Sequence, residues 1–153
     1  MPFQVSMSGD DTFLLNGNVV STLATKDPLK INFPNDIVVV EQGKDGNTVI
    51  SENRRGYEGD AVLRVLLGAA DDQVINALFL EQAANIAGTT LITGALYKVS
   101  GDGNGNITKV VYQLQGGVIL KIPAALISAS GNTEEQIAEW TIRFGNCSQR
   151  LIQ

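Results

Sequence analysis

The 153-residue sequence contains no histidine, and this absence narrows the chemistry open to it. Histidine is the side chain that most often serves as a general base or a zinc ligand near neutral pH. Most common designs of hydrolases and metal sites are therefore excluded. The single cysteine, Cys147, cannot form an intrachain disulfide, which suits a reducing compartment. Its expected role is that of a small buried or half-buried apolar residue.

Long apolar runs and a recognisable secretory signal are also lacking. Nowhere do about 18 apolar residues follow one another, and the N-terminal MPFQVSMSGDD has no basic segment before an apolar run. These absences predict a cytoplasmic product with no membrane partner. The sequence has fewer cationic than anionic side chains, 11 Lys and Arg against 16 Asp and Glu, which gives a formal net charge of −5. An acidic chain gains no counterion-release attraction, so general nucleic-acid binding is not expected.

What the sequence does contain is glycine, which falls between short segments rich in Val, Ile, Leu and Thr. This spacing predicts a mainly β fold of about seven to ten strands joined by tight turns. The length and the 44% hydrophobic content predict one domain over residues 1–153. Asn16-Gly17 and Asp45-Gly46 each lie between two apolar segments and have the composition of tight hairpin turns. A long mid-chain loop is expected from Glu52 to Asp60.

One segment departs from the β pattern and predicts a flanking α-helix within residues 68–88. Its apolar stripe at helical spacing consists of Ile75, Leu78, Phe79, Ala83 and Ile86. Asp71 or Asp72 is expected to cap the N-terminal amides, and Gly88 to end the helix in a left-handed conformation. Packing of the stripe against a sheet accounts for its apolar residues.

Alternating strands are expected again after the helix. They are placed at 90–100, 107–115, 117–129 and 136–146. Pro123 makes the third either an edge strand or one that breaks at that point. In the second, Val110, Tyr112 and Leu114 share one face, and Lys109, Val111 and Gln113 the other. In the last, Trp140, Ile142 and Phe144 share one face, and Thr141 and Arg143 the other.

The stretch SGDGNGNIT, residues 100–108, is the one segment that resembles a cation-binding loop. Asp102, Asn104 and Asn106 alternate with glycines, but an EF-hand loop needs glutamate at its twelfth position, where Gln113 stands. The loop also lies between expected strands, whereas an EF-hand loop joins helices. Gly, Asn and Asp are the residues of tight turns, so a hairpin tip is predicted.

No group of residues offers a catalytic, cofactor or metal site. The adjacent Glu134 and Glu135 are interpreted as turn or helix-start residues, because nothing nearby would separate their pKa values as acid and base catalysis requires. Arg54 and Arg55 are either solvated or bind a carboxylate of a neighbouring subunit. They are the candidate inter-subunit contact.

Three stretches resemble the inner tail tube proteins of contractile-tailed bacteriophages and their tailocin relatives. They are LLGAADDQVINALF, YKVSGDGNGNITKVVYQLQGGVILKIPAA and GNTEEQIAEWTIRFGN, within roughly residues 36–150. The resemblance implies an antiparallel β-sandwich or small barrel with one flanking α-helix. It also implies a structural virion protein without enzymatic activity, metal or cofactor. It implies six copies in a ring, rings stacked into a hollow tube inside a sheath, and a mid-chain loop at about 43–59 that reaches toward the next ring.

The implied tube belongs to a virion tail assembled in the host cytoplasm, with tail sheath, baseplate and tape measure proteins as partners. DNA would pass through without specific binding, because carboxylates lining a channel repel phosphate. Two alternatives stay open. One is the related secretion-system or tailocin tube protein, and the other is a monomeric β-sandwich module that binds a ligand such as a carbohydrate.

Overall fold

The computed structural model describes residues 7–8, 11–24, 27–125, 127 and 136–152. The strands are β1 (Met7–Ser8), β2 (Thr12–Leu15), β3 (Asn18–Val19), β4 (Leu29–Asn32), β5 (Val38–Gln42), β6 (Thr48–Glu52), β7 (Gly59–Leu66), β8 (Ile92–Gly101), β9 (Ile107–Lys121) and β10 (Ile137–Ile152). The helices are α1 (Ala70–Ala84) and two short 3-10 helices, η1 (Arg54–Tyr57) and η2 (Ile86–Gly88). Glu134 and Glu135 lie outside the described residues.

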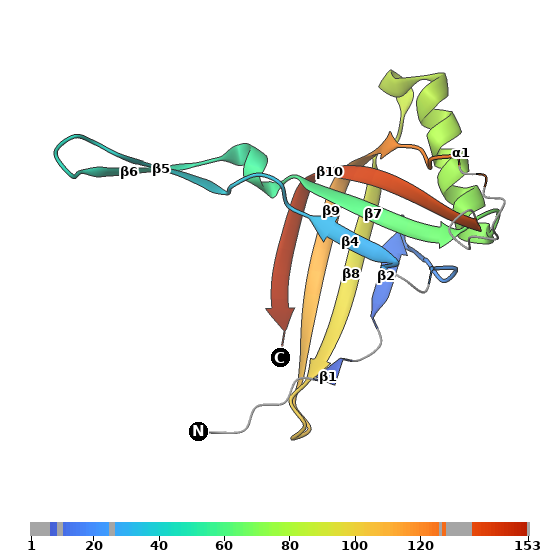
Figure 1. The fold of residues 1–153 in the computed structure, drawn as a ribbon, viewed down its shortest axis with the longest axis horizontal. Helices are drawn as coiled ribbons and strands as arrows, with labels where there is room; N and C mark the ends of the chain where they lie inside the picture. Colours follow the sequence, from blue (N-terminus) through green and yellow to red (C-terminus); the bar gives the residue numbers. More distant parts are fainter. Residues whose placement is uncertain (1–6, 9–10, 25–26, 126, 128–135, 153) are drawn as a thin grey trace.

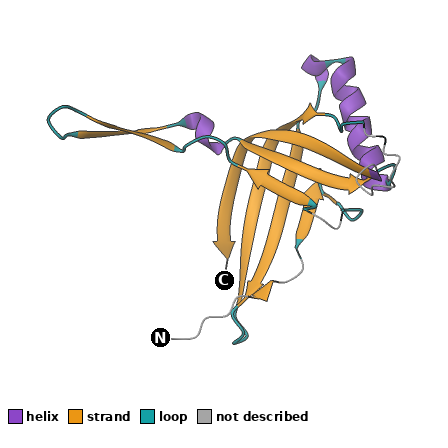
Figure 2. Ribbon diagram, in the orientation of Figure 1, coloured by secondary structure: helices purple, strands orange, loops and turns teal. Residues whose placement is uncertain are grey.

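Eight strands form one antiparallel sheet in the order β3-β2-β8-β9-β10-β7-β4, with β1 paired to β8. The sheet curls around its core and α1 lies across one end of it, while β5 and β6 form a separate hairpin that projects away (Figures 1 and 2). The terminal strands β3 and β4 do not pair in the described part of the chain, so the sheet is not closed. The mainly β, sandwich-like antiparallel fold with one helix is confirmed.

A band of glycines lets the long strands bend. Gly94, Gly117 and Gly145 lie on β8, β9 and β10, and Gly116 has a positive φ of 69°. A Cβ on Gly117 would lie 2.6 Å from the ring of Phe144 and 2.8 Å from the carbonyl of Ile92. Only glycine fits here without displacing the ring, and the sheet folds over its own core at this level.

This bend corrects one prediction from the sequence. The expected strands at 107–115 and 117–129 are a single strand, β9, because Gly116 continues the chain through the bend instead of turning it back. Pro123 lies beyond the end of that strand. The last strand runs to Ile152, six residues beyond its expected end.

The core contains the apolar faces that the alternation predicted. Trp140, Ile142 and Phe144 are buried and Arg143 is exposed, as expected for β10. Val111 is also buried, although it lies on the opposite face of β9 from Tyr112 and Leu114. Its neighbours in register there are Tyr97 and Arg150. Cys147 is buried in the core cluster, which confirms its apolar role.

Helix α1 contacts the core through the first half of its stripe. Ile75 is buried, Leu78 and Phe79 pack on the core, and the Phe79 ring lies 6.0 Å from that of Trp140. The prediction that the second half of the stripe packs against the sheet is wrong, because Ala83 and Ile86 are exposed. The helix ends at Ala84, where Asn85 takes an extended conformation, and Gly88 lies in η2 without a positive φ.

The predicted aspartate cap is also wrong, because tertiary contacts take both carboxylates. Ala69 is the N-cap and makes no side-chain hydrogen bond. Asp72 accepts hydrogen bonds from the indole Nε1 of Trp140 at 2.8 Å and the backbone N–H of Gly68 at 2.9 Å. Asp71 accepts from the Thr22 hydroxyl and from the backbone N–H groups of Ser21 and Thr22.

These bonds change the pKa of Asp71. Burial opposes its ionisation, but the hydrogen bonds from Thr22 and Ser21 outweigh that effect and lower the pKa below the ordinary value. The negative carboxylate therefore ties the segment after β3 to the start of α1.

The two predicted hairpin turns and the tip at residues 102–106 are confirmed. Asn16 and Gly17 have φ values of 50° and 82°, and Gly46 has 82°, as tight turns require. In the third turn, the Asp102 carboxylate accepts hydrogen bonds from the side chain and backbone of Asn106 and the backbone of Asn104, and these bonds lower its pKa. The described residues contain no cluster of three or more potential metal ligands.

Candidate assembly interface

The hairpin of β5 and β6, residues 38–52, is solvent-exposed along its whole length, and we call it the arm. Every one of its strand residues is solvent-exposed. Five of them are large aliphatic side chains, namely Val38, Val39, Val40, Val49 and Ile50, with Ile50 at 67%. Monomeric proteins rarely leave so many apolar residues together in water, so this surface is a candidate for contact with another protein.

The arm also corrects the expected loop at 43–59. Residues 48–52 form strand β6 and residues 54–57 form η1, so only the tip and short joints are irregular. The β-branched residues of TVISE favour a strand, and pairing with VVVEQ completes a two-stranded ladder.

Hydrogen bonds from two asparagines fix the base of the arm. Asn53 donates through Nδ2 to the carbonyl of Asp36 at 2.8 Å and accepts through Oδ1 from the backbone N–H of Arg55 at 3.2 Å. Asn35 donates through Nδ2 to the carbonyl of Arg55 at 3.1 Å and to a carboxylate oxygen of Glu58 at 3.4 Å. These bonds join both ends of the arm to η1, so the arm projects in a defined direction.

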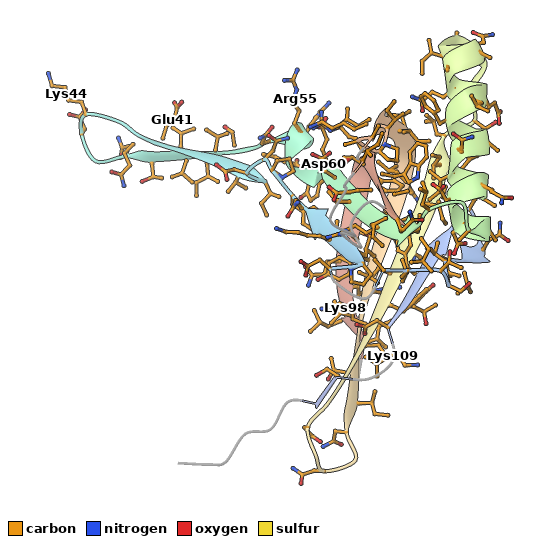
Figure 3. The ribbon with its side chains drawn as sticks, turned by 45° about the vertical axis from the view of Figure 1, so that its right-hand side comes forward. Glu41, Lys44, Arg55, Asp60, Lys98 and Lys109 are labelled. Carbon is orange, nitrogen blue, oxygen red and sulfur yellow. The ribbon has the colours of Figure 1, made fainter. Side chains whose placement is uncertain are left out.

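Arg54 and Arg55 lie at this base, on η1. Both side chains are exposed, and neither has an ion-pair partner among the residues that the structure describes. Figure 3 shows Arg55 pointing into solvent at the root of the arm. The pair is therefore placed beside the candidate interface, and its contact with another subunit remains a prediction.

A bidentate ion pair lies just below the arm. Arg143 donates from Nε to Asp60 Oδ1 at 2.8 Å and from an Nη to Asp60 Oδ2 at 3.1 Å. These hydrogen bonds and the Asp60 charge raise the pKa of Arg143. Because the two residues face each other on β10 and β7, the pair reinforces the register at the start of β7.

The arm and the long strands of the sheet carry opposite net charges. The arm, residues 38–52, carries three carboxylates, Glu41, Asp45 and Glu52, against Lys44. Strands β8, β9 and β10 carry the cations Lys98, Lys109, Lys121, Arg143 and Arg150 and one carboxylate, Glu139. The arm is thus net negative and the long sheet net positive, a division that the total charge does not reveal.

The second half of β10 offers a strand edge. Its pairing with β7 ends at Phe144, so residues 145–152 have β9 on one side and no strand partner on the other in the described structure. An exposed strand edge is a template for pairing with another chain. The molecule therefore has two surfaces, the arm and this edge, that suit contact with further copies.

A groove of about 460 Å³ opens between β4 and the strands β2, β8 and β9. Its apolar lining includes Phe13, Leu29, Ile31 and Leu96, and Lys30 and Lys98 also line it. A smaller hollow of about 380 Å³ lies between η1 and β10 and is lined partly by Cys147. Burial and the nearby Asp60 charge raise the pKa of the Cys147 thiol to about 11, so this cysteine is a poor nucleophile.

Among the described residues, no helix is both long and apolar enough to cross a membrane. Neither the models of known protein families nor the curated proteins yield a match to the sequence. Similarity to solved structures is clear, by contrast, and extends over nearly the whole chain.

Three solved structures of tube, cap and terminator assemblies align with this chain. A chain of the PVC sheath-tube complex of an extracellular contractile injection system, in the extended state, aligns with TM-score 0.62 and 7% identity over 93% of this chain and 88% of its own. The cap that terminates the anti-feeding prophage tube aligns with TM-score 0.59 and 12% identity, over 93% of this chain and 88% of its own. A PVC sheath/tube terminator in the extended state aligns with TM-score 0.54 and 8% identity, over 92% of each chain.

The chain therefore has the fold found in tube and terminator complexes of contractile injection systems. This agrees with the resemblance to tail tube proteins that the sequence carries. At these identities the similarity establishes the fold, and individual residue roles must come from the chain itself.

Proposed function

We propose that the chain is a structural, non-enzymatic subunit of a contractile tail tube. Six copies form a ring, and rings stack into a hollow tube that contacts sheath, tape measure and baseplate proteins. The observation that carries this proposal is the arm, whose aliphatic side chains are not covered by any part of the chain that the structure describes. The shared fold and the open edge of β10 support it, because both suit an assembly of repeated copies.

In this proposal the tube belongs to a virion tail, is assembled in the host cytoplasm and conducts DNA through an acidic bore. The net charge of −5 supports a repulsive wall. One face of β9 and β10, opposite Tyr112 and Leu114, carries the cations Lys109 and Arg150 and cannot supply an acidic wall. In an acidic bore the wall must therefore consist of other surfaces, such as those that carry Glu41, Asp45 and Glu52 on the arm.

Electron microscopy of the concentrated protein tests the proposal, with annular particles or hollow rods as the expected result. Replacing Val40 by lysine should abolish the rods, because it places a charge on the apolar arm. Val19→Lys is the matched control, since this valine is equally exposed on β3, away from the arm. Both variants should keep the wild-type free energy of unfolding to within about 0.5 kcal/mol.

A wild-type chain that stays monomeric under every condition would refute the proposal. A monomer that binds a defined glycan would favour the ligand-binding alternative instead. Rods recovered with sheath but without packaged DNA would indicate a secretion-system or tailocin tube. A reconstruction in which the bore wall is positively charged would refute the acidic bore and leave the tube intact.

A further inference from the structure

The groove between β4 and β8 combines apolar walls with two lysines that lack counter-ions. Neither Lys30 nor Lys98 has a carboxylate within ion-pair distance among the described residues. The carboxylate that lines the groove, Asp11, already accepts a 3.2 Å hydrogen bond from the backbone N–H of Val99. Lys98 lies two residues from Leu96 on β8, so both side chains point to the same side of the sheet. The groove therefore suits an apolar segment that carries negative charge.

The arm has this composition on one of its faces. Val40 lies opposite Ile50 and Val38 lies opposite Glu52 in the β5–β6 ladder, and alternation places all four side chains on one side. Each of the four is exposed, and Glu52 has no ion-pair partner in the described part of the chain. The other side carries Val39, Glu41, Val49 and Ser51, and Ile50 makes the first side the bulkier of the two.

The arm of a chain does not reach its own groove. It projects away from the sheet in Figure 1, and Figure 3 shows Glu41 and Lys44 on the arm far from Lys98. The asparagine bonds at its base, described above, hold it in that direction. Any arm that occupies the groove must therefore belong to a different copy.

We infer that the Val38, Val40 and Ile50 face of the arm of one copy binds in the groove of another, with Glu52 facing Lys98. This inference rests on the proposed tube and specifies the receiving site within it. The groove volume, about 460 Å³, lies in the range of about 300–1,000 Å³ found for binding pockets. Because the arm and the groove are different surfaces, a head-to-tail contact of this kind can repeat from copy to copy through an assembly.

Thiol crosslinking between two variants tests the arrangement. Chains carrying Ile50→Cys are mixed with tagged chains carrying Lys98→Cys, assembled, and treated with a short bis-maleimide. The expected product is a crosslinked pair that contains one tagged chain. Lys109→Cys is the matched control, because this lysine is also exposed but lies on the opposite face of the sheet. Wild-type protein controls for the buried Cys147.

Charge exchange supplies an independent readout that does not depend on new cysteines. Lys98→Glu should raise the concentration needed for assembly about threefold, the size expected of an exposed ion pair. Adding Glu52→Lys to the same chain should restore most of the loss, since each contact then regains opposite charges.

The outcomes separate the inference from the proposed function. Rods or rings that form while Ile50→Cys crosslinks equally to Lys98→Cys and Lys109→Cys, or to neither, would overturn the groove as the receiving site and leave the tube standing. Assembly that tolerates Lys98→Glu without loss would do the same. A chain that never associates would overturn the tube itself.

Discussion

Gly56 and Ile37 cross so closely that a Cβ on Gly56 would lie 2.5 Å from the Ile37 Cα and 2.6 Å from the Asp36 carbonyl oxygen. This contact joins η1 to the segment that enters the arm. A methyl group here must push two backbone segments apart, which typically costs about 1–3 kcal/mol.

We therefore predict that Gly56→Ala lowers the free energy of unfolding by about 1–3 kcal/mol and weakens assembly, because the arm leaves its defined direction. Gly43→Ala is the control on the same arm, since a Cβ there meets only an ordinary 3.6 Å contact. Chemical denaturation and sedimentation measure the two effects. A Gly56→Ala protein as stable and as assembled as Gly43→Ala would contradict the prediction.

The hydrogen bond from Trp140 to Asp72 predicts a difference between two substitutions. Asp72→Ala leaves the buried indole N–H without its partner and should cost about 1–3 kcal/mol. Asp72→Asn keeps an acceptor oxygen and should cost less. Trp140 is the only tryptophan, so its fluorescence reports both unfolding and its local environment. Equal losses for the two variants would contradict the assigned role of the hydrogen bond.

The lowered pKa of Asp71 makes stability depend on pH. A carboxyl group whose folded pKa lies below its ordinary value of 3.8 stabilises the fold above that value, and the contribution is lost as the pH falls through the folded pKa. Asp71→Asn should therefore be less stable than wild type near neutral pH, and the difference should shrink in acid.

Denaturation curves from about pH 7 down to about pH 2 measure this trend. Asp45→Asn, which removes an exposed carboxylate at the tip of the arm, is the control for the change of net charge. A gap between wild type and Asp71→Asn that stays constant over the whole range would show that the carboxylate charge is not what stabilises this contact.

Cys147 should react slowly while the chain is folded. With a pKa of about 11, little of the thiol is ionised near pH 8, so alkylation should be about a hundredfold slower than in the unfolded chain. Iodoacetamide labelling followed by mass spectrometry measures both rates, with a sample in denaturant as the reference. Labelling of the native protein at the unfolded rate would contradict the burial of this residue.

Local patterns predicted the elements whose stability depends on neighbouring residues. The Asn16-Gly17 turn, the tip around Asp102 and the buried face of β10 were all foreseen, because turn chemistry and period-2 alternation act over a few residues. The helix was foreseen in position but not in its caps. Trp140 and Thr22, distant in sequence, hold the two aspartates that local rules assigned to the first turn.

The candidate interface was predicted only in outline. The sequence predicted the turn at Asp45-Gly46 between two apolar segments, but it expected a loop from Glu52 to Asp60 and did not single out the aliphatic residues of the arm. A run such as VVVEQ near TVISE is an equally good buried strand, so only the structure shows that it is exposed. The groove was missed because β4 and β8 are far apart in the sequence.

By itself the sequence determined the mainly β fold, the turns and the absence of histidine chemistry, because these follow from residue type and short-range periodicity. Only the tertiary structure decided which apolar residues stay in water, how the charges divide between arm and sheet, and where the long strands bend. Those properties depend on which distant segments of the chain meet, and the free energy of such contacts cannot be inferred from any short stretch of sequence.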